Sequence, residues 1–172
     1  MAASTEGERA GLRLLGLGNE ILADDAFGIR VAQEVERRYT GRIQVAYSSA
    51  SSFVLMDDVL GASRLLVVDT IVTGRSKPGT IHVFTADQIQ PAPGGSPHFV
   101  GLFEMLAVGR QLGLPVPQEA VIIAVEASDC TTVGGPMCAD VRSAIAEAVD
   151  LVGQFLAHGS LDPAAWPGSH QI

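Results

Sequence analysis

Short apolar runs alternate with amphipathic stretches along the chain. Five runs bounded by turn-forming residues predict strands, at Leu12–Leu17, Ile43–Tyr47, Arg64–Thr70, Thr80–Phe84 and Ala120–Val125. Apolar residues at helical spacing predict four helices, over Asp25–Tyr39, Ser51–Leu60, Pro97–Leu112 and Cys138–Ala157. Because strand and helix alternate, we expect an α/β fold, a single three-layer domain whose mainly parallel, twisted sheet has helices on both faces.

Two segments depart from this regular alternation. The Pro78-Gly79 pair predicts that the strand after it runs antiparallel to the preceding strand or lies at a sheet edge. Residues 86–97 are rich in proline and glycine and predict a long loop. We expect one domain over residues 12–157, with flexible ends at 1–11 and 158–172.

Composition narrows the class of protein. The 172 residues contain 11 Lys and Arg against 19 Asp and Glu, a formal charge of -8, which disfavours nucleic acid as a partner. The two cysteines, Cys130 and Cys138, are too few for a disulfide framework and fit a reducing compartment. No secretory signal and no run of about 18 apolar residues is evident, so we expect a cytoplasmic protein that does not bind membranes. We expect a monomer, although the sequence does not decide whether the chain dimerises.

Three chemically capable side chains follow predicted strands or open a helix. Asp25 follows the first strand, Asp69 ends the long aliphatic strand, and His98 lies in the first turn of the helix that Pro97 begins. Ligands of open α/β sheets bind beyond the carboxyl ends of the strands. Two carboxylates and an imidazole brought together there would suit a borderline metal such as nickel or zinc.

Two of these three residues also have a structural interpretation. Asp69, directly after Leu-Leu-Val-Val, is instead expected near a sheet edge in a desolvated place, where an ionised acid needs a partner. Asp24 and Asp25 are typical of the acidic start of a helix, and Asp24 could replace Asp25 as a ligand. His98 could be a capping or surface histidine. We expect Asp25, Asp69 and His98 to lie near the surface of a crevice.

Other polar residues have weaker functional signals. His82 is expected to be a strand residue with its polar atoms satisfied, and Glu126 follows the last strand without an evident partner. The Gly16-Leu17-Gly18 segment lacks the third glycine of a dinucleotide fingerprint, because Ile21 stands there. Phosphate-loop and nucleophile-elbow motifs are also absent from the sequence.

The segment from Gly16 to Gly28, GLGNEILADDAFG, resembles the N-terminal signature of the [NiFe]-hydrogenase maturation proteases. The resemblance continues in order through Asp69, the Pro78-Gly79-Thr80 turn, Ser96-Pro97-His98 and Val125-Glu126, and covers most of residues 12–155. It implies a five-stranded, mainly parallel sheet. By position, the family's nickel-engaging residues fall on Asp25, Asp69 and His98.

The resemblance also implies an activity. Such endopeptidases remove a C-terminal peptide from a [NiFe]-hydrogenase large-subunit precursor, and the nickel they recognise belongs to that substrate rather than to the protease. Two roles for nickel remain open: a Lewis acid toward the scissile carbonyl, or a positioning element while a carboxylate activates water. The chain departs from the family pattern at Ala26 and at Ser51-Ser52.

Two other functions are compatible with parts of the sequence. Peptidyl-tRNA hydrolases also open with Gly-Leu-Gly-Asn, but that family continues with Pro-Gly and an early histidine, whereas Glu20-Ile21 follows here. A non-catalytic module or chaperone that holds a metalloenzyme precursor is the remaining alternative. Cleavage of a nickel-loaded precursor would separate it from the protease.

Overall fold

The computed structural model describes residues 11–49, 52–85 and 97–159, with residues 52–53 and 97–100 described by their backbone alone. The strands are β1 (Leu12–Leu17), β2 (Gln44–Ser48), β3 (Arg64–Ile71), β4 (Ile81–Thr85) and β5 (Glu119–Glu126). The helices are α2 (Phe27–Arg38), α3 (Met56–Val59), α4 (Pro97–Gln111) and α5 (Ala139–His158), with 3-10 turns η1 (Ala23–Ala26) and η2 (Ser52–Leu55).

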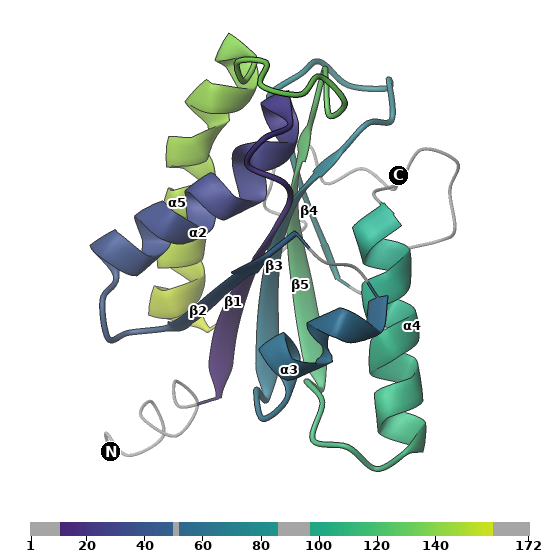
Figure 1. Ribbon diagram of the computed structural model, residues 1–172. Coiled ribbons are helices and arrows are strands. Elements are labelled where there is room, and N and C mark those ends of the chain that lie inside the picture. Colours follow the sequence, from purple (N-terminus) through teal and green to yellow (C-terminus); the bar gives the residue numbers. More distant parts are fainter. Residues whose placement is uncertain (1–10, 50–51, 86–96, 160–172) are drawn as a thin grey trace.

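The five strands form one sheet in the order β2-β1-β3-β5-β4. The first four strands in this order are parallel, and β4 is an edge strand that runs antiparallel to β5. Helices α2 and α5 cover one face, and α3 and α4 lie on the other (Figure 1). The predicted three-layer α/β fold is therefore confirmed. The edge position of β4 is also as predicted, but its partner is β5 and not the preceding strand β3.

Each face of the sheet has its own apolar core. Side chains alternate between the faces, so Leu14 and Leu66 pack under α2 and α5, whereas Leu15 and Leu65 pack on the α4 side. All four are at most 1% exposed. This double burial explains why β3 reads as an uninterrupted aliphatic run, since no face of a central parallel strand meets water.

Two glycines bring α2 into direct contact with the sheet. A Cβ atom at Gly28 would lie 2.1 Å from the carbonyl oxygen of Leu17 and 2.4 Å from that of Val68. A Cβ atom at Gly16 would lie 2.4 Å from the carbonyl oxygen of Gly28. Backbone meets backbone at this crossing, so no larger side chain fits without displacing the helix. The glycines thereby hold η1, which precedes α2, against the carboxyl ends of β1 and β3.

Several predicted boundaries change. The helix expected from Asp25 begins as the 3-10 turn η1 and becomes α-helical only at Phe27. The helix expected over Ser51–Leu60 consists of η2 followed by a single α-helical turn, α3, and Ser51 lies outside the described residues. The flexible ends are predicted at 1–11 and 158–172, and residues 1–10 and 160–172 lie outside the description, as do residues 86–96 of the predicted loop. The predicted start of the C-terminal tail is wrong, because His158 is the last residue of α5. No helix in the described parts of the chain is both long and apolar enough to cross a membrane.

Candidate active site

The strand order places two of the three candidate residues at one point of the sheet. Strand β2 lies on one side of β1, and β3, the next strand along the chain, lies on the other side. The direction of the connections therefore reverses between β1 and β3, which makes this pair a topological switch point. Asp25 lies in η1, just after β1, and Asp69 lies near the carboxyl end of β3. The crevice that such a switch point creates is the expected ligand site of a doubly wound sheet.

Thr70 connects the two carboxylates. Its hydroxyl donates a hydrogen bond to Oδ1 of Asp25 over 3.2 Å, and its backbone N–H lies 2.7 Å from Oδ1 of Asp69. One residue thus fixes an oxygen of each acid. The two aspartates lie on different elements but are held in one polar cluster.

Burial of the two aspartates differs from expectation. Asp69 is 0% exposed and Asp25 is 9% exposed, so neither lies at the surface of a crevice. Burial of Asp69 agrees with the desolvated place that the sequence predicts for it. The predicted surface position was wrong for both residues, because it was inferred from their distance to strand ends, whereas η1 packs against β3. Buried carboxylates need hydrogen bonds or a cation, and this pair is therefore suited to binding a positively charged group.

Asp24 has a structural role that the sequence did not reveal. Its carboxylate accepts hydrogen bonds from the backbone N–H groups of Ser128 and Asp129, both at 2.9 Å, and of Cys138 at 2.6 Å. The helix-capping interpretation is wrong for Asp24 and Asp25, since neither α2 nor η1 has a side-chain cap. Asp24 instead fastens the segment between β5 and α5 to η1. Both of its oxygens are occupied by these contacts, which disfavours it as an alternative ligand.

Cys130 belongs to the same polar cluster. Its Sγ lies 3.6 Å from the Thr70 hydroxyl, which in turn reaches Asp25. Burial raises the pKa of the Cys130 thiol to about 11, against the lowering effect of the Thr70 hydrogen bond, and the carboxylates of Asp25, Asp24 and Asp69 raise it further. The thiol therefore stays protonated at neutral pH, mainly because it is buried.

His98 is the second residue of α4 (Pro97–Gln111), in the helix's first turn as predicted. Its side chain lies outside the described part of the structure, so its distance to the aspartates is not defined. Among the side chains that are described, no group of three His, Cys, Asp or Glu residues is arranged to hold a metal.

Comparison with known proteins identifies the family. The model of the HycI family, described as hydrogenase maturation protease, matches residues 29–154. The chain belongs to this family. The match spans most of the sheet and all of α4, and it agrees with the resemblance carried by residues 16–28. It favours the protease over the peptidyl-tRNA hydrolase and chaperone alternatives.

Curated relatives support the assignment. The hydrogenase expression/formation protein HupD of Bradyrhizobium diazoefficiens is 31% identical over 162 residues, which cover 91% of this chain and 82% of the relative. The hydrogenase 2 maturation protease of Escherichia coli is 27% identical over 116 residues, covering 65% of this chain and 70% of the relative.

Solved structures show the same fold. The hydrogenase maturating endopeptidase HybD from E. coli superposes with a TM-score of 0.72 at 22% identity, covering 87% of this chain and 93% of that one. The [NiFe] hydrogenase maturation protease HybD from Thermococcus kodakarensis gives a TM-score of 0.69 at 22% identity, covering 84% and 98%. At this identity the likeness concerns the fold.

Glu126 holds a loop of this protease near the same sheet edge. Its carboxylate accepts hydrogen bonds from the N–H groups of Thr73 and Gly74, at 2.7 and 2.8 Å, and from the Thr73 hydroxyl at 2.7 Å. Glu126 is 1% exposed. These partners, missed in the sequence because they follow a different strand, give Glu126 the structural task of ordering the start of the β3–β4 connection.

His82 differs from its prediction. Neither ring nitrogen has a hydrogen-bond partner in the described structure, although the residue is only 8% exposed. Oε2 of Glu126 lies 3.9 Å from Nε2 of His82, which is within ion-pair range but beyond hydrogen-bond distance. A buried imidazole without hydrogen-bond partners is unfavourable, because its two polar atoms lose their hydration and form no hydrogen bond in return.

Replacing His82 by methionine is therefore expected to stabilise the protein. The apolar side chain of similar size removes the desolvation cost, so we expect the free energy of unfolding to rise by about 1 kcal/mol. Urea denaturation followed by circular dichroism measures the change. The exposed His158→Met serves as the control and should leave stability unchanged. A loss of stability in His82→Met would show that the imidazole has a partner in solution.

The raised pKa of Cys130 predicts its reactivity. In a Cys138→Ser variant, which leaves Cys130 as the single thiol, alkylation by iodoacetamide should be slow at pH 8 and should accelerate up to a pH near 11.

The unfolded thiol titrates near its ordinary value of about 8.5. Between about pH 8.5 and 11 the Cys130 thiol thus keeps its proton in the folded protein but loses it in the unfolded chain. Its contribution to the free energy of unfolding is complete below about pH 8.5 and is lost as the pH rises toward 11. Intact-mass measurements over time give both rates, with urea-unfolded protein as the control, and equal rates at pH 8 would contradict the prediction.

Proposed function

We propose that this protease removes a C-terminal peptide from a nickel-loaded [NiFe]-hydrogenase large-subunit precursor, and that Asp25, Asp69 and His98 face the nickel of that substrate. The observation that carries the proposal is the pair of buried carboxylates, Asp25 and Asp69, joined through Thr70 at the switch point of the sheet.

The chemistry of the cluster suits recognition of a metal held by another protein. Carboxylate oxygens and an imidazole nitrogen are ligands for borderline divalent metals. Three such groups leave coordination positions for donors of the precursor itself. An incomplete set binds free metal weakly, so the protease would engage nickel only where the precursor supplies the remaining ligands.

Residues around the two aspartates support the binding of a metal. Thr70 orients Asp25 and Asp69, since its hydroxyl and its N–H each hold one carboxylate oxygen. Asp24 holds the segment that carries Cys130 over the cluster. Burial of the aspartates excludes water around them and strengthens their attraction for a cation. Nickel, once seated, would lie beside the peptide that is cut, either polarising its carbonyl or positioning it for a water activated by a carboxylate.

The test is cleavage of the precursor itself. Purified protein is incubated with a large-subunit precursor from the same source, with and without nickel loaded, and loss of the C-terminal peptide is followed by intact mass. We expect cleavage of the nickel-loaded form only. Equal cleavage of both forms would remove nickel recognition from the proposal, and binding without cleavage would favour a chaperone.

A further inference from the structure

The segments that follow β1 and β5 are joined at the rim of the site. Leu22 forms an isolated antiparallel bridge with Val133, and the N–H of Gly134 donates to the carbonyl of Ile21 over 2.7 Å. The joined segments leave two large apolar side chains in water, with Ile21 60% and Val133 72% exposed. Val133 lies directly opposite Leu22, and side chains alternate along each segment, so Ile21 and Val133 project from opposite faces of this pairing.

A cavity of about 300 Å³ lies next to this pair, at the ends of α2 and α5. It is lined by Glu20, Ala23, Ala26, Arg30, Gly135, Met137, Arg142 and Ile145. Glu20 and Ala23 come from the Ile21 segment, and Gly135 comes from the Val133 segment. We call this cavity, with the two joined segments that contribute to its lining, the rim surface.

The rim surface carries positive charge in an acidic protein. Two guanidinium groups, of Arg30 and Arg142, line the cavity against the single carboxylate of Glu20, whereas the whole chain has a formal charge of -8. Arg30 contacts Glu20 only at 3.8 Å, and both side chains are about half exposed. Arg142 donates to the carbonyl oxygen of Met137 at 2.8 Å. This local excess of guanidinium favours a carboxylate, to which arginine can donate two parallel hydrogen bonds.

One short turn separates the rim surface from the aspartate cluster. Ala23 and Ala26, the first and last residues of η1, line the cavity. Between them, Asp24 and Asp25 make their hydrogen bonds with Cys138 and Thr70 within the protein. A ligand in the cavity would thus lie directly against the turn that carries Asp25.

We propose that the rim surface binds an acidic peptide segment of the hydrogenase precursor, with a carboxylate between Arg30 and Arg142. This inference rests on the proposed function for the identity of the partner. An acidic segment is attracted to the guanidinium groups of this surface, whereas the negatively charged remainder of the protein repels it. The surface supplies affinity for the polypeptide, separate from recognition of nickel.

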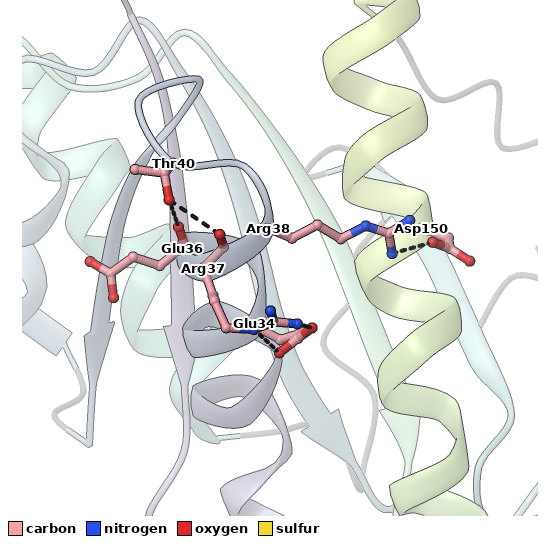
Figure 2. Close-up of polar contacts among 6 residues, drawn as sticks. All are labelled: Glu34, Glu36, Arg37, Arg38, Thr40 and Asp150. Carbon is pink, nitrogen blue, oxygen red and sulfur yellow. Dashed lines mark hydrogen bonds and ion pairs between the residues drawn. The ribbon is translucent and has the colours of Figure 1, made fainter.

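Charge reversal tests the proposal. Arg30→Glu and Arg142→Glu are each expected to raise KM for the nickel-loaded precursor about tenfold and to leave kcat within about twofold, because binding is lost but the reacting groups are intact. Arg37→Glu is the matched control on the same helix. Arg37 is exposed and forms an ion pair with Glu34, as Figure 2 shows, so the reversal there should leave KM unchanged.

Further variants guard against a merely structural effect. Arg30→Gln and Arg142→Lys are milder changes for use if a reversal prevents folding. Raising the salt concentration from 50 to 500 mM should weaken binding of wild-type protein to the precursor more than binding of the double reversal, because salt screens exposed charges.

The outcomes separate the two proposals. A KM within about twofold of wild type in both reversals overturns the rim surface as a docking site and leaves the proposed function intact. If wild-type protein binds the precursor but does not cleave it, the proposed function is wrong. The docking site is then tested by whether Arg30→Glu and Arg142→Glu bind the precursor more weakly than wild type does. If it neither binds nor cleaves the precursor, both proposals fall.

Discussion

Replacing Asp25 or Asp69 by asparagine is expected to lower the rate of precursor cleavage by about a hundredfold or more. The amide has nearly the shape of the carboxylate but lacks its charge, and it is a poor ligand for a divalent metal. Replacing a residue that only hydrogen-bonds to a metal ligand typically lowers metal affinity or activity about ten- to a hundredfold. The loss of a direct ligand should therefore be at least as severe. Replacing His98 by alanine should have the same effect.

The structure explains why these variants should still fold. The side-chain oxygen of asparagine can accept the Thr70 hydroxyl at position 25 and the Thr70 N–H at position 69, as the aspartates do. Removing a buried charge also lowers the desolvation cost. Single-turnover cleavage of nickel-loaded precursor gives the rates, and urea denaturation verifies folding.

The control is Asp57→Asn, which changes an exposed carboxylate on α3. It should cleave the precursor at the wild-type rate. Normal processing by all three site variants would exclude Asp25, Asp69 and His98 from nickel recognition. If only one of the two aspartate variants loses cleavage activity, that aspartate takes part in cleavage and the other has only a structural role.

Replacing Asp24 by alanine is expected to lower the free energy of unfolding by about 3 kcal/mol or more. Three backbone N–H groups, of Ser128, Asp129 and Cys138, would lose a fully buried charged acceptor. Each hydrogen bond to a charged group contributes about 1.5–3 kcal/mol, and a donor left unsatisfied adds its own cost. Urea denaturation measures the loss.

Two comparisons sharpen this prediction. Asp57→Ala removes an exposed carboxylate and should change stability by less than about 0.5 kcal/mol. Asp24→Ala should also speed alkylation of Cys130 under conditions where the protein remains folded, because the Ser128–Asp129 segment is then released from η1. A loss below about 1 kcal/mol, with unchanged Cys130 reactivity, would mean that this segment is held by its other contacts.

The contrast between neighbouring acids shows what decides their roles. Asp24 and Asp25 are adjacent, have the same chemistry and fit the same helix-capping pattern. In the structure, Asp24 binds three N–H groups of the β5–α5 segment, whereas Asp25 accepts the hydroxyl of Thr70 on β3. Their partners lie 45 or more positions away in the sequence, so no local pattern could separate a fastening residue from a candidate ligand.

The sequence by itself determined the architecture and the family of this protein. Strand and helix positions follow from apolar periodicity, which is a local property, and the α/β class follows from their alternation. The signature from Gly16 to Gly28 is one contiguous segment and is read in the same way, and the structure adds that its glycines allow the close contact between α2 and the sheet. These features depend on residues near one another in the chain and can be read without coordinates.

Only the tertiary structure decided how the polar residues are used. The pairing of β4 with β5, the switch point between β1 and β3, and the unpartnered imidazole of His82 all depend on strand order. Cys130 joined the aspartate cluster through Thr70, and the rim surface arose where the Ile21 and Val133 segments meet. The physical reason is the same throughout: hydrogen bonds, burial and local charge are set by groups distant in sequence, which a one-dimensional pattern does not record.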